Sequence, residues 1–223
     1  MVLALLSATA AAFVQTERLK LEVVPVEPIR VSRAISPVCG CGRARASIRL
    51  VVRRADVLTL KIADANGRPV RDLAAGRDVR PGRPAFSWNG RDANGRIVRD
   101  GTYHVLLELG REGRRIELPQ AITVDTVPPV ARLVSFRPHV IAPRLRARVV
   151  VTYRLSERAH AVLFVNGVQR VLTYSSARSS RLEWFATRNR KRLPSGRYRL
   201  QLAGLDAAGN LGPRTRVFVV RVG

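Results

Sequence analysis

Basic side chains are the residues of this sequence best placed to bind a partner. Four of them fall within the five-residue run RNRKR at 188–192, and three others occupy every second position of residues 144–148. The seven candidates are Arg144, Arg146, Arg148, Arg188, Arg190, Lys191 and Arg192. A period of two puts the first three on one face of a strand, where guanidinium groups can bind phosphates or carboxylates. The pattern predicts a surface for a polyanion: nucleic acid, an envelope polymer or an anionic lipid.

The overall charge supports that prediction but has a second explanation. The 223 residues include 40 Lys and Arg against 16 Asp and Glu, and only three of the 40 are lysines. Residues 127–223 have 19 basic and three acidic residues (net +16), whereas residues 43–126 have 17 and ten (net +7). An anionic partner should therefore favour the C-terminal part. The alternative is a solvated arginine-rich surface that reflects GC-rich coding, and the shortage of aromatic residues for base stacking disfavours nucleic acid.

The two cysteines, Cys39 and Cys41, are separated by a single glycine. A disulfide between them closes a very small ring, which strains its geometry. Pairing with a cysteine of another chain is the alternative. Metal capture is a third reading, but a closed zinc site needs four ligands and the sequence offers no others nearby. We expect a strained or an intermolecular disulfide, in an oxidising compartment.

Catalytic and metal-binding motifs are missing from the sequence. It contains no glycine-rich phosphate loop, HExxH, GxSxG or CxxC. His104, His139 and His160 have no paired acids nearby in sequence and are expected at the surface or packed. The DAN runs at 64–66 and 92–94 resemble the start of a calcium loop, but an arginine follows at the next ligand position and no glutamate closes the loop. The sequence thus predicts no enzyme, no cofactor and no metal site.

Apolar residues recur with period two from residue 43 onward, which predicts an all-β fold. Asn-Gly pairs at 66–67 and 94–95 supply the positive φ of tight hairpins, with Asp64 and Asp92 able to accept backbone N–H bonds. The predicted strands are 47–52, 57–62, 85–88, 102–109, 114–118 and 121–124, then 147–155, 161–165, 169–174, 181–186, 196–205 and 216–222.

These two sets of strands contain the same landmarks in the same order. The equivalent pairs are Asn66-Gly67 with Asn166-Gly167, Trp88 with Trp184, and Tyr103 with Tyr198. The repeat predicts two tandem antiparallel β-sandwiches, at 43–126 and 127–223. Both tryptophans and both tyrosines should pack within their own sandwich, because their strand parity also places apolar neighbours inside. The run VDTVPPV (124–130) marks the boundary, since consecutive prolines stiffen a linker.

The segment 86–109, FSWNGRDANGRIVRDGTYHVLLEL, resembles the signature of FlgD-type immunoglobulin-like domains, and the likeness covers about residues 43–126. Residues 130–223 resemble more loosely a second bacterial Ig-like module, chiefly through 195–212. That module departs from the family pattern, since Trp184 is followed by Phe-Ala where the family has x-Gly. The resemblance implies an extracytoplasmic adhesive or scaffold module; nothing here resembles the hook-assembly region of a flagellar hook cap.

The N-terminal residues predict export or anchoring. Residues 1–14 contain no charge, but they are shorter than the roughly 20 residues that cross a bilayer as a helix. They suit a signal peptide or a membrane anchor, with a nonpolar helical start of a soluble protein as the alternative. Residues 15–42 contain three prolines and the two cysteines, and are expected to form an extended stalk.

Together these patterns predict a non-enzymatic structural or adhesive module of the bacterial cell envelope, secreted or membrane-anchored through its N-terminal segment. Its partner would be a protein or an anionic envelope polymer. The alternative is a basic module that binds polyanions through the second sandwich.

Overall fold

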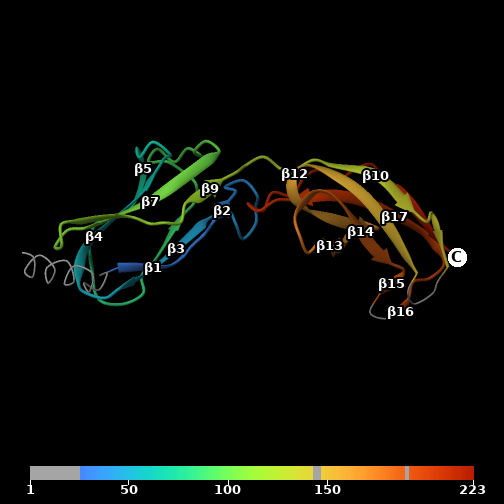
Figure 1. Cartoon of the computed structure of the whole chain (residues 1–223), viewed down its shortest axis with the longest axis horizontal. Coiled ribbons are helices and arrows are strands. Elements are labelled where there is room, and N and C mark those ends of the chain that lie inside the picture. The colour runs from blue at the N-terminus through green and yellow to red at the C-terminus, as the bar shows by residue number, and fades with distance from the viewer. Residues whose placement is uncertain (1–25, 143–146, 189–190) are drawn as a thin grey trace, which may run out of the picture.

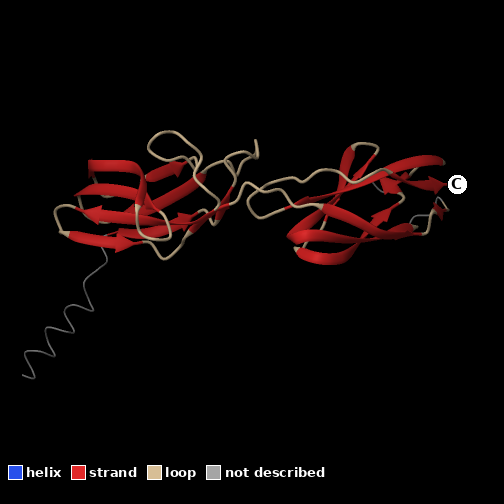
Figure 2. Ribbon diagram, turned by 90° about the horizontal axis from the view of Figure 1, so that it is seen from above, coloured by secondary structure: helices blue, strands red, loops and turns tan. Residues whose placement is uncertain are grey.

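The computed structural model describes residues 26–142, 147–188 and 191–223, and all its regular elements are β-strands. They form two sandwiches joined end to end along the long axis of the molecule (Figures 1 and 2). The predicted fold class, two tandem Ig-like sandwiches, is confirmed. The described part contains no helix that is long and apolar enough to cross a membrane. The predicted signal peptide or anchor at 1–14 lies outside the described residues.

The first sandwich packs a three-stranded sheet against a larger one. The small sheet has the order β1 (Val26–Val31), β3 (Ala46–Val52), β6 (Ala85–Trp88). The large sheet has the order β2 (Ala34–Ile35), β9 (Ile122–Val124), β7 (Gly101–Leu109), β4 (Asp56–Ala63), β5 (Pro69–Val79), and β8 (Arg114–Glu117) also pairs with β7. Alternate residues of β3, β4 and β7 are buried, as period two requires when one face of a sheet covers a core.

The second sandwich is organised around one long strand. β12 (Arg148–Val165) pairs through its first part with β10 (Ala131–Arg137) and β14 (Ala177–Phe185). Its second part pairs with β13 (Val168–Leu172) and β17 (Gly196–Leu205), beside which lie β18 (Phe218–Val222) and β11 (Val140–Ile141). A short hairpin, β15 (Thr187–Arg188) and β16 (Lys191–Arg192), follows β14. β12 therefore belongs to both sheets.

The two sandwiches share one topology. The orders β1-β3-β6 and β2-β9-β7-β4-β5 correspond to β10-β12-β14 and β11-β18-β17-β12-β13. Where the first sandwich breaks the chain into β3 and β4, the second runs it through as β12. The repeat detected in the sequence is thus a repeat of strand pairing.

The equivalent aromatic residues make equivalent contacts. The ring centroids are 5.1 Å apart for Trp88 and Tyr103, and 5.6 Å for Trp184 and Tyr198. Each tyrosine hydroxyl donates to the carbonyl oxygen four residues earlier, Tyr103 at 2.7 Å and Tyr198 at 2.9 Å. This is the tyrosine corner of Ig-like sandwiches. Both tryptophans and Tyr103 are buried, while Tyr198 is only partly so.

The Asp-Ala-Asn-Gly turns form as predicted from side-chain acceptors. Asp64 Oδ1 accepts from the amides of Asn66 and Arg68, and Asp92 makes the same pair of bonds in the next turn. Gly67 has φ +77°, while Asn66 is not among the residues with positive φ. The hairpin between β12 and β13 differs, because Asn166 and Gly167 both have positive φ. The two aligned Asn-Gly pairs therefore use different turn geometries.

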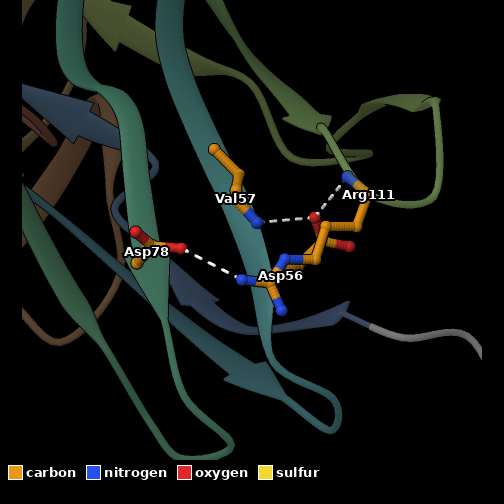
Figure 3. A network of polar contacts seen from close by, with 4 residues as sticks. All are labelled: Asp56, Val57, Asp78 and Arg111. Atoms are coloured by element: carbon orange, nitrogen blue, oxygen red, sulfur yellow. Dashed lines mark hydrogen bonds and ion pairs between the residues drawn. The ribbon is translucent and has the colours of Figure 1, made fainter.

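A buried carboxylate anchors the far end of the first sandwich (Figure 3). Asp56, only 3% exposed, accepts at Oδ1 from the amides of Val57 (2.6 Å) and Arg111 (2.8 Å). The Arg111 guanidinium reaches Asp78 on β5 at 3.3 Å. Asp56 thus ties the start of β4 to the β7–β8 turn, which is a structural role.

The predicted stalk is the main difference from the expectations above. Residues from Val26 onward belong to the first sandwich, since β1 pairs with β3 and Val26, Val31 and Ile35 are buried. The prolines favour extended chain, as expected, but the apolar residues between them complete a sheet. Strands β5 and β10 were also not predicted, because their residues alternate less regularly between buried and exposed.

Candidate functional site

The junction between the sandwiches is built from a short linker held at both ends. Thr126 donates through its hydroxyl and its amide to the carboxylate of Asp100 in the first sandwich, at 3.0–3.1 Å. The amide of Val130 donates to Ser156 Oγ in the second sandwich at 2.9 Å. Only Val127, Pro128 and Pro129 lie between these attachment points. Two prolines in so short a segment restrict the angles between the sandwiches.

Close packing of Pro129 restrains the linker further. A Cβ on Gly204 would lie 2.8 Å from Pro129 Cγ, and a Cβ on Gly212 would overlap the Pro129 carbonyl oxygen. The two glycines are bonded to each other, Gly212 N to Gly204 O at 2.8 Å. They leave a slot in the second sandwich that the linker backbone fills.

The turn at 206–210 attaches the second sandwich to the linker. Asp206 and Asn210 are each 4% exposed. Asp206 Oδ1 accepts from the amides of Gly209 and Asn210, and Asn210 Nδ2 donates to Asp206 Oδ2 at 2.7 Å. The same Nδ2 also donates to the Asp125 carbonyl oxygen at 2.9 Å. The sequence predicts a turn here, and the structure adds its contact with the linker.

The cysteine loop of the first sandwich faces this turn. Cys39 and Cys41 form a disulfide with each other. Cys41 Sγ lies 3.7 Å from the Gly209 carbonyl oxygen, and Arg43 donates to the carbonyl oxygen of Ala207. Gly209 has φ +96°, and a Cβ there would lie 2.7 Å from Cys41 Sγ. The predicted disulfide residues therefore contribute to the contact between the sandwiches, which sequence spacing could not reveal.

Carboxylates gather at the same junction. Partial burial raises the pKa of Glu157, with further contributions from the neighbouring negative charges of Asp125 and Asp206; Arg178 opposes them. These three acids come from the linker, from β12 and from the 206–210 turn.

The predicted polyanion surface is described only in part. Arg144, Arg146 and Arg190 lie outside the described residues. Arg148 opens β12 and forms an ion pair with Glu183 of β14 at 3.0 Å. Arg188 and Lys191 lie opposite each other on the paired strands of the β15–β16 hairpin, and Arg192 is exposed. The strand pairing was missed because two-residue strands leave no periodic signal.

The three histidines all contact neighbouring groups. His104 Nδ1 lies 2.7 Å from Glu117 Oε1 on the exposed side of β7 and β8, an acid that sequence proximity did not reveal. His139 packs edge-on against Phe136, and His160 Nδ1 bonds the Thr173 carbonyl oxygen. In the described part of the chain, no three His, Cys, Asp or Glu side chains converge as metal ligands. The His104–Glu117 contact is a surface pair on an open sheet face.

Comparison with known proteins agrees with this architecture for the first sandwich. The FlgD Ig-like domain family matches residues 35–112. The Basal-body rod modification protein FlgD of Salmonella typhimurium is 34% identical over 62 residues, which are 28% of this chain and 26% of that protein. The match thus spans about a quarter of the curated relative. The predicted resemblance is confirmed, with the family match beginning at residue 35 rather than 43.

A solved structure shares the fold of most of the chain at low identity. The FN1–FN3 domains of chicken CNTN1 align with a TM-score of 0.50 and 12% identity, covering 87% of this chain and 64% of that one. Fibronectin(III)-like modules of Clostridium thermocellum CbhA align with a TM-score of 0.46 and 13% identity, covering 88% and 92%. At this identity the CNTN1 likeness shows the fold alone.

Proposed function

We propose that this chain is a non-enzymatic spacer of the bacterial cell envelope, which holds an attached surface or partner at a set distance and angle outside the cytoplasm. The observation that carries the proposal is the junction: a three-residue span between attachment points, a glycine slot around Pro129 and a disulfide-closed loop against the 206–210 turn. A spacer needs limited bending between its domains, and these contacts oppose bending.

Other observations support the location and the absence of catalysis. The apolar, uncharged residues 1–14 and the cysteine pair suit an exported chain. The matched FlgD relative is named as a basal-body rod modification protein, which suggests the envelope. Ig-like sandwiches most often serve as structural or binding modules, although fold likeness alone assigns no function.

Small-angle X-ray scattering of the full chain tests the spacer role. Gly212→Ala adds a methyl group where the Pro129 carbonyl oxygen lies, so the junction should loosen and the radius of gyration should change. Gly223→Ala is the matched control, because a Cβ at Gly223 meets nothing within 4 Å and the residue lies at the C-terminal end, away from the junction (Figure 1). Identical scattering from wild type and both variants, with both sandwiches folded, would show that the junction does not set the angle.

Cell fractionation with thiol labelling tests the location. We expect the chain in the envelope or the medium, with Cys39 and Cys41 protected from alkylation until a reductant is added. A chain recovered only from the cytosol, with both thiols labelled at once, contradicts the proposed location.

A second candidate function is binding of polyanions by the second sandwich. It is favoured by the charge of residues 127–223, which contain 19 basic residues and only three acidic ones. Among the described residues, the ion pairs of this sandwich are limited to Arg148 with Glu183. The remaining exposed arginines therefore keep their charge available for an anion.

Polyphosphate binding at increasing salt tests this candidate. Replacing Arg188, Arg190, Lys191 and Arg192 by Gln should weaken binding and flatten its salt dependence, because fewer counterions are released. The control carries the same charge loss on exposed arginines of the first sandwich: Arg77, Arg80, Arg83 and Arg114. If the two quadruple variants weaken polyphosphate binding equally, the arginine excess is a general property of the surface and not a binding site of the second sandwich.

A further inference from the structure

Two strands of the second sandwich lie at open sheet edges next to each other. β13 and β14 both pair with β12, on its second and first parts respectively, and in the described part of the chain neither has another strand partner. Figure 1 shows them side by side, one from each sheet. An unpaired edge presents free backbone N–H and C=O groups to solvent.

Two neighbouring cavities lie between these edges. One cavity of about 550 Å³ is lined by Val168, Arg170 and Phe185. A second, of about 290 Å³, is lined by Leu172 and Arg181. Val171 and Glu183 line both cavities, so the two adjoin. We call the pair of cavities the edge groove.

The edge groove exposes apolar side chains. Val168 is 51% exposed, Leu172 47% and Phe185 41%. Tyr174, just beyond β13, is fully exposed and lines the second cavity. Clustered exposed apolar residues at a sheet edge are unusual in a protein that stays alone in solution, because they promote pairing with another chain.

The charge around the groove is positive. Arg170 and Arg181 are exposed on opposite walls, one on β13 and one on β14. The one acid of the lining, Glu183, is already paired with Arg148. The groove therefore favours acidic side chains on whatever fills it.

The first sandwich covers the equivalent edge. The amide of Ala93 donates to the Val70 carbonyl oxygen on β5 at 3.0 Å, and Arg71 donates to the Asp92 carbonyl oxygen at 2.9 Å. The 91–97 turn thus lies over β5. The register of β5 against β4 also shifts at three places, a feature that blunts an edge. The open edge of β13 therefore has no equivalent in the first sandwich, whereas β6, which corresponds to β14, also ends its sheet.

We propose that the edge groove binds an extended segment of a partner protein, with alternating apolar and acidic residues, by strand addition. The backbone of the segment would pair with the free edge of β14, its apolar side chains would lie on the core side, where Val168 and Val171 lie, and its carboxylates would lie on the other side, with Arg181. Arg170, on the opposite wall, adds to the positive charge around them. A second copy of this chain is a poorer occupant, because its sandwich would bring the same net +16 to the contact. The inference goes beyond the spacer role and does not depend on it.

Fluorescence anisotropy with labelled nine-residue peptides tests this proposal on the full chain. The probe alternates glutamate and valine, starting and ending with glutamate. One control peptide has the same composition in two blocks, five glutamates then four valines, and the other is nona-glutamate. We expect the alternating peptide to bind at least ten-fold more tightly than either control, because only alternation places all valines on one side of a strand.

Protein variants locate the binding site. The double variant Arg170→Glu, Arg181→Glu should weaken binding of the alternating peptide by at least ten-fold, with the fold checked by circular dichroism. The matched control is Arg154→Glu, Arg216→Glu, which makes the same charge change at exposed residues of the second sandwich that do not line the groove. Val168→Ser tests the apolar contact without changing charge and should also weaken binding.

Three outcomes would overturn the proposal. Equal binding of nona-glutamate would show a general polyanion surface. Equal loss in the control double variant would show a nonspecific charge effect. Self-association in analytical ultracentrifugation that is abolished by Val168→Ser would identify a second copy as the occupant. None of these results bears on the junction, so the spacer role is tested separately.

Discussion

Gly90 of the first sandwich and Ala186 of the second occupy equivalent positions, each two residues after its tryptophan. Gly90 has φ +69°, and a Cβ there would overlap Pro37 Cγ. Ala186 is completely buried, is not among the residues with positive φ, and donates its amide to the Ala147 carbonyl oxygen at 2.9 Å. The family glycine is therefore required by a backbone conformation and a close approach that belong to the first sandwich. Its loss in the second leaves the tryptophan–tyrosine contact in place.

The comparison extends from the cores to the surfaces. The aromatic pairs, tyrosine corners and strand orders are duplicated, whereas the covered edge of β5 and the open edge of β13 are not. The net charges, +7 and +16, also differ. The difference teaches that the fold is held by a small set of repeated interior contacts, while the surfaces of the two sandwiches are free to diverge in binding properties.

The largest effects should come from the tryptophans. Trp88→Ala should lower the free energy of unfolding of the first sandwich by about 3–5 kcal/mol, because it leaves a large cavity and removes the 2.9 Å bond from Nε1 to the Arg91 carbonyl oxygen. Trp184→Ala should cost the second sandwich a similar amount. Urea unfolding followed by fluorescence of the remaining tryptophan checks that the other sandwich is unaffected. A loss under about 1 kcal/mol in either sandwich would break the equivalence of the two cores.

The equivalent positions after the tryptophans should respond unequally. Gly90→Ala should cost about 1–3 kcal/mol, because an L side chain is strained at this positive φ and Pro37 must move. Ala186→Gly should cost only about 0.5–1 kcal/mol, mainly through backbone entropy. Thermal and urea unfolding of both variants measure the contrast. Equal costs would mean that the backbone difference between the two sites does not matter to stability.

The tyrosine corners should contribute smaller and similar amounts. Tyr103→Phe and Tyr198→Phe each remove one hydroxyl-to-carbonyl bond, worth about 0.5–1.5 kcal/mol. The effect should be larger at Tyr103, because its ring is more buried and the Arg99 carbonyl oxygen is harder to rehydrate. A larger loss of stability in Tyr198→Phe than in Tyr103→Phe would indicate that the hydroxyl bond of the second sandwich contributes more.

The smallest effect, at Glu157, depends on pH. Its pKa is raised in the folded chain by burial and by Asp125 and Asp206, so the ionised form destabilises the fold and stability falls as pH rises from the unfolded pKa through the folded one. Glu157→Gln should therefore raise the urea midpoint slightly at pH 7. The gain should disappear near pH 3.5, where the carboxyl group is protonated in both states. A gain that persists at pH 3.5 would assign the effect to packing instead of charge.

Much of the fold could be predicted because it depends on local patterns. The period-two alternation of apolar residues predicted β3, β4, β7 and β17. The Asp-Ala-Asn-Gly turns could be predicted because each has an aspartate acceptor close to a glycine. The predicted break between 155 and 161 was wrong, since β12 continues through both sheets. Interruption of the alternation at Ser156–Arg158 marks a change of sheet there, and one sequence does not distinguish such a change from a turn.

The candidate sites were predicted less well. The arginines were identified by their charge and spacing, and Arg148 proved to be paired with an acid 35 residues away. No sequence motif predicts the edge groove, because its walls come from two strands whose exposed residues have the same composition as an ordinary solvent-exposed surface. The junction was recognised as a proline linker, but not as a contact with the cysteine loop.

By itself, the sequence determined what depends on neighbours along the chain: strand parity, turn residues, the internal repeat and the distribution of charge. Only the tertiary structure decided which surfaces meet. It brought Cys41 to Gly209, 168 residues apart, left the edges of β13 and β14 without strand partners in the described chain, and covered β5. The physical reason is that burial and backbone pairing at an edge depend on what packs there from distant parts of the chain, and alternation along a single strand contains no record of that neighbour.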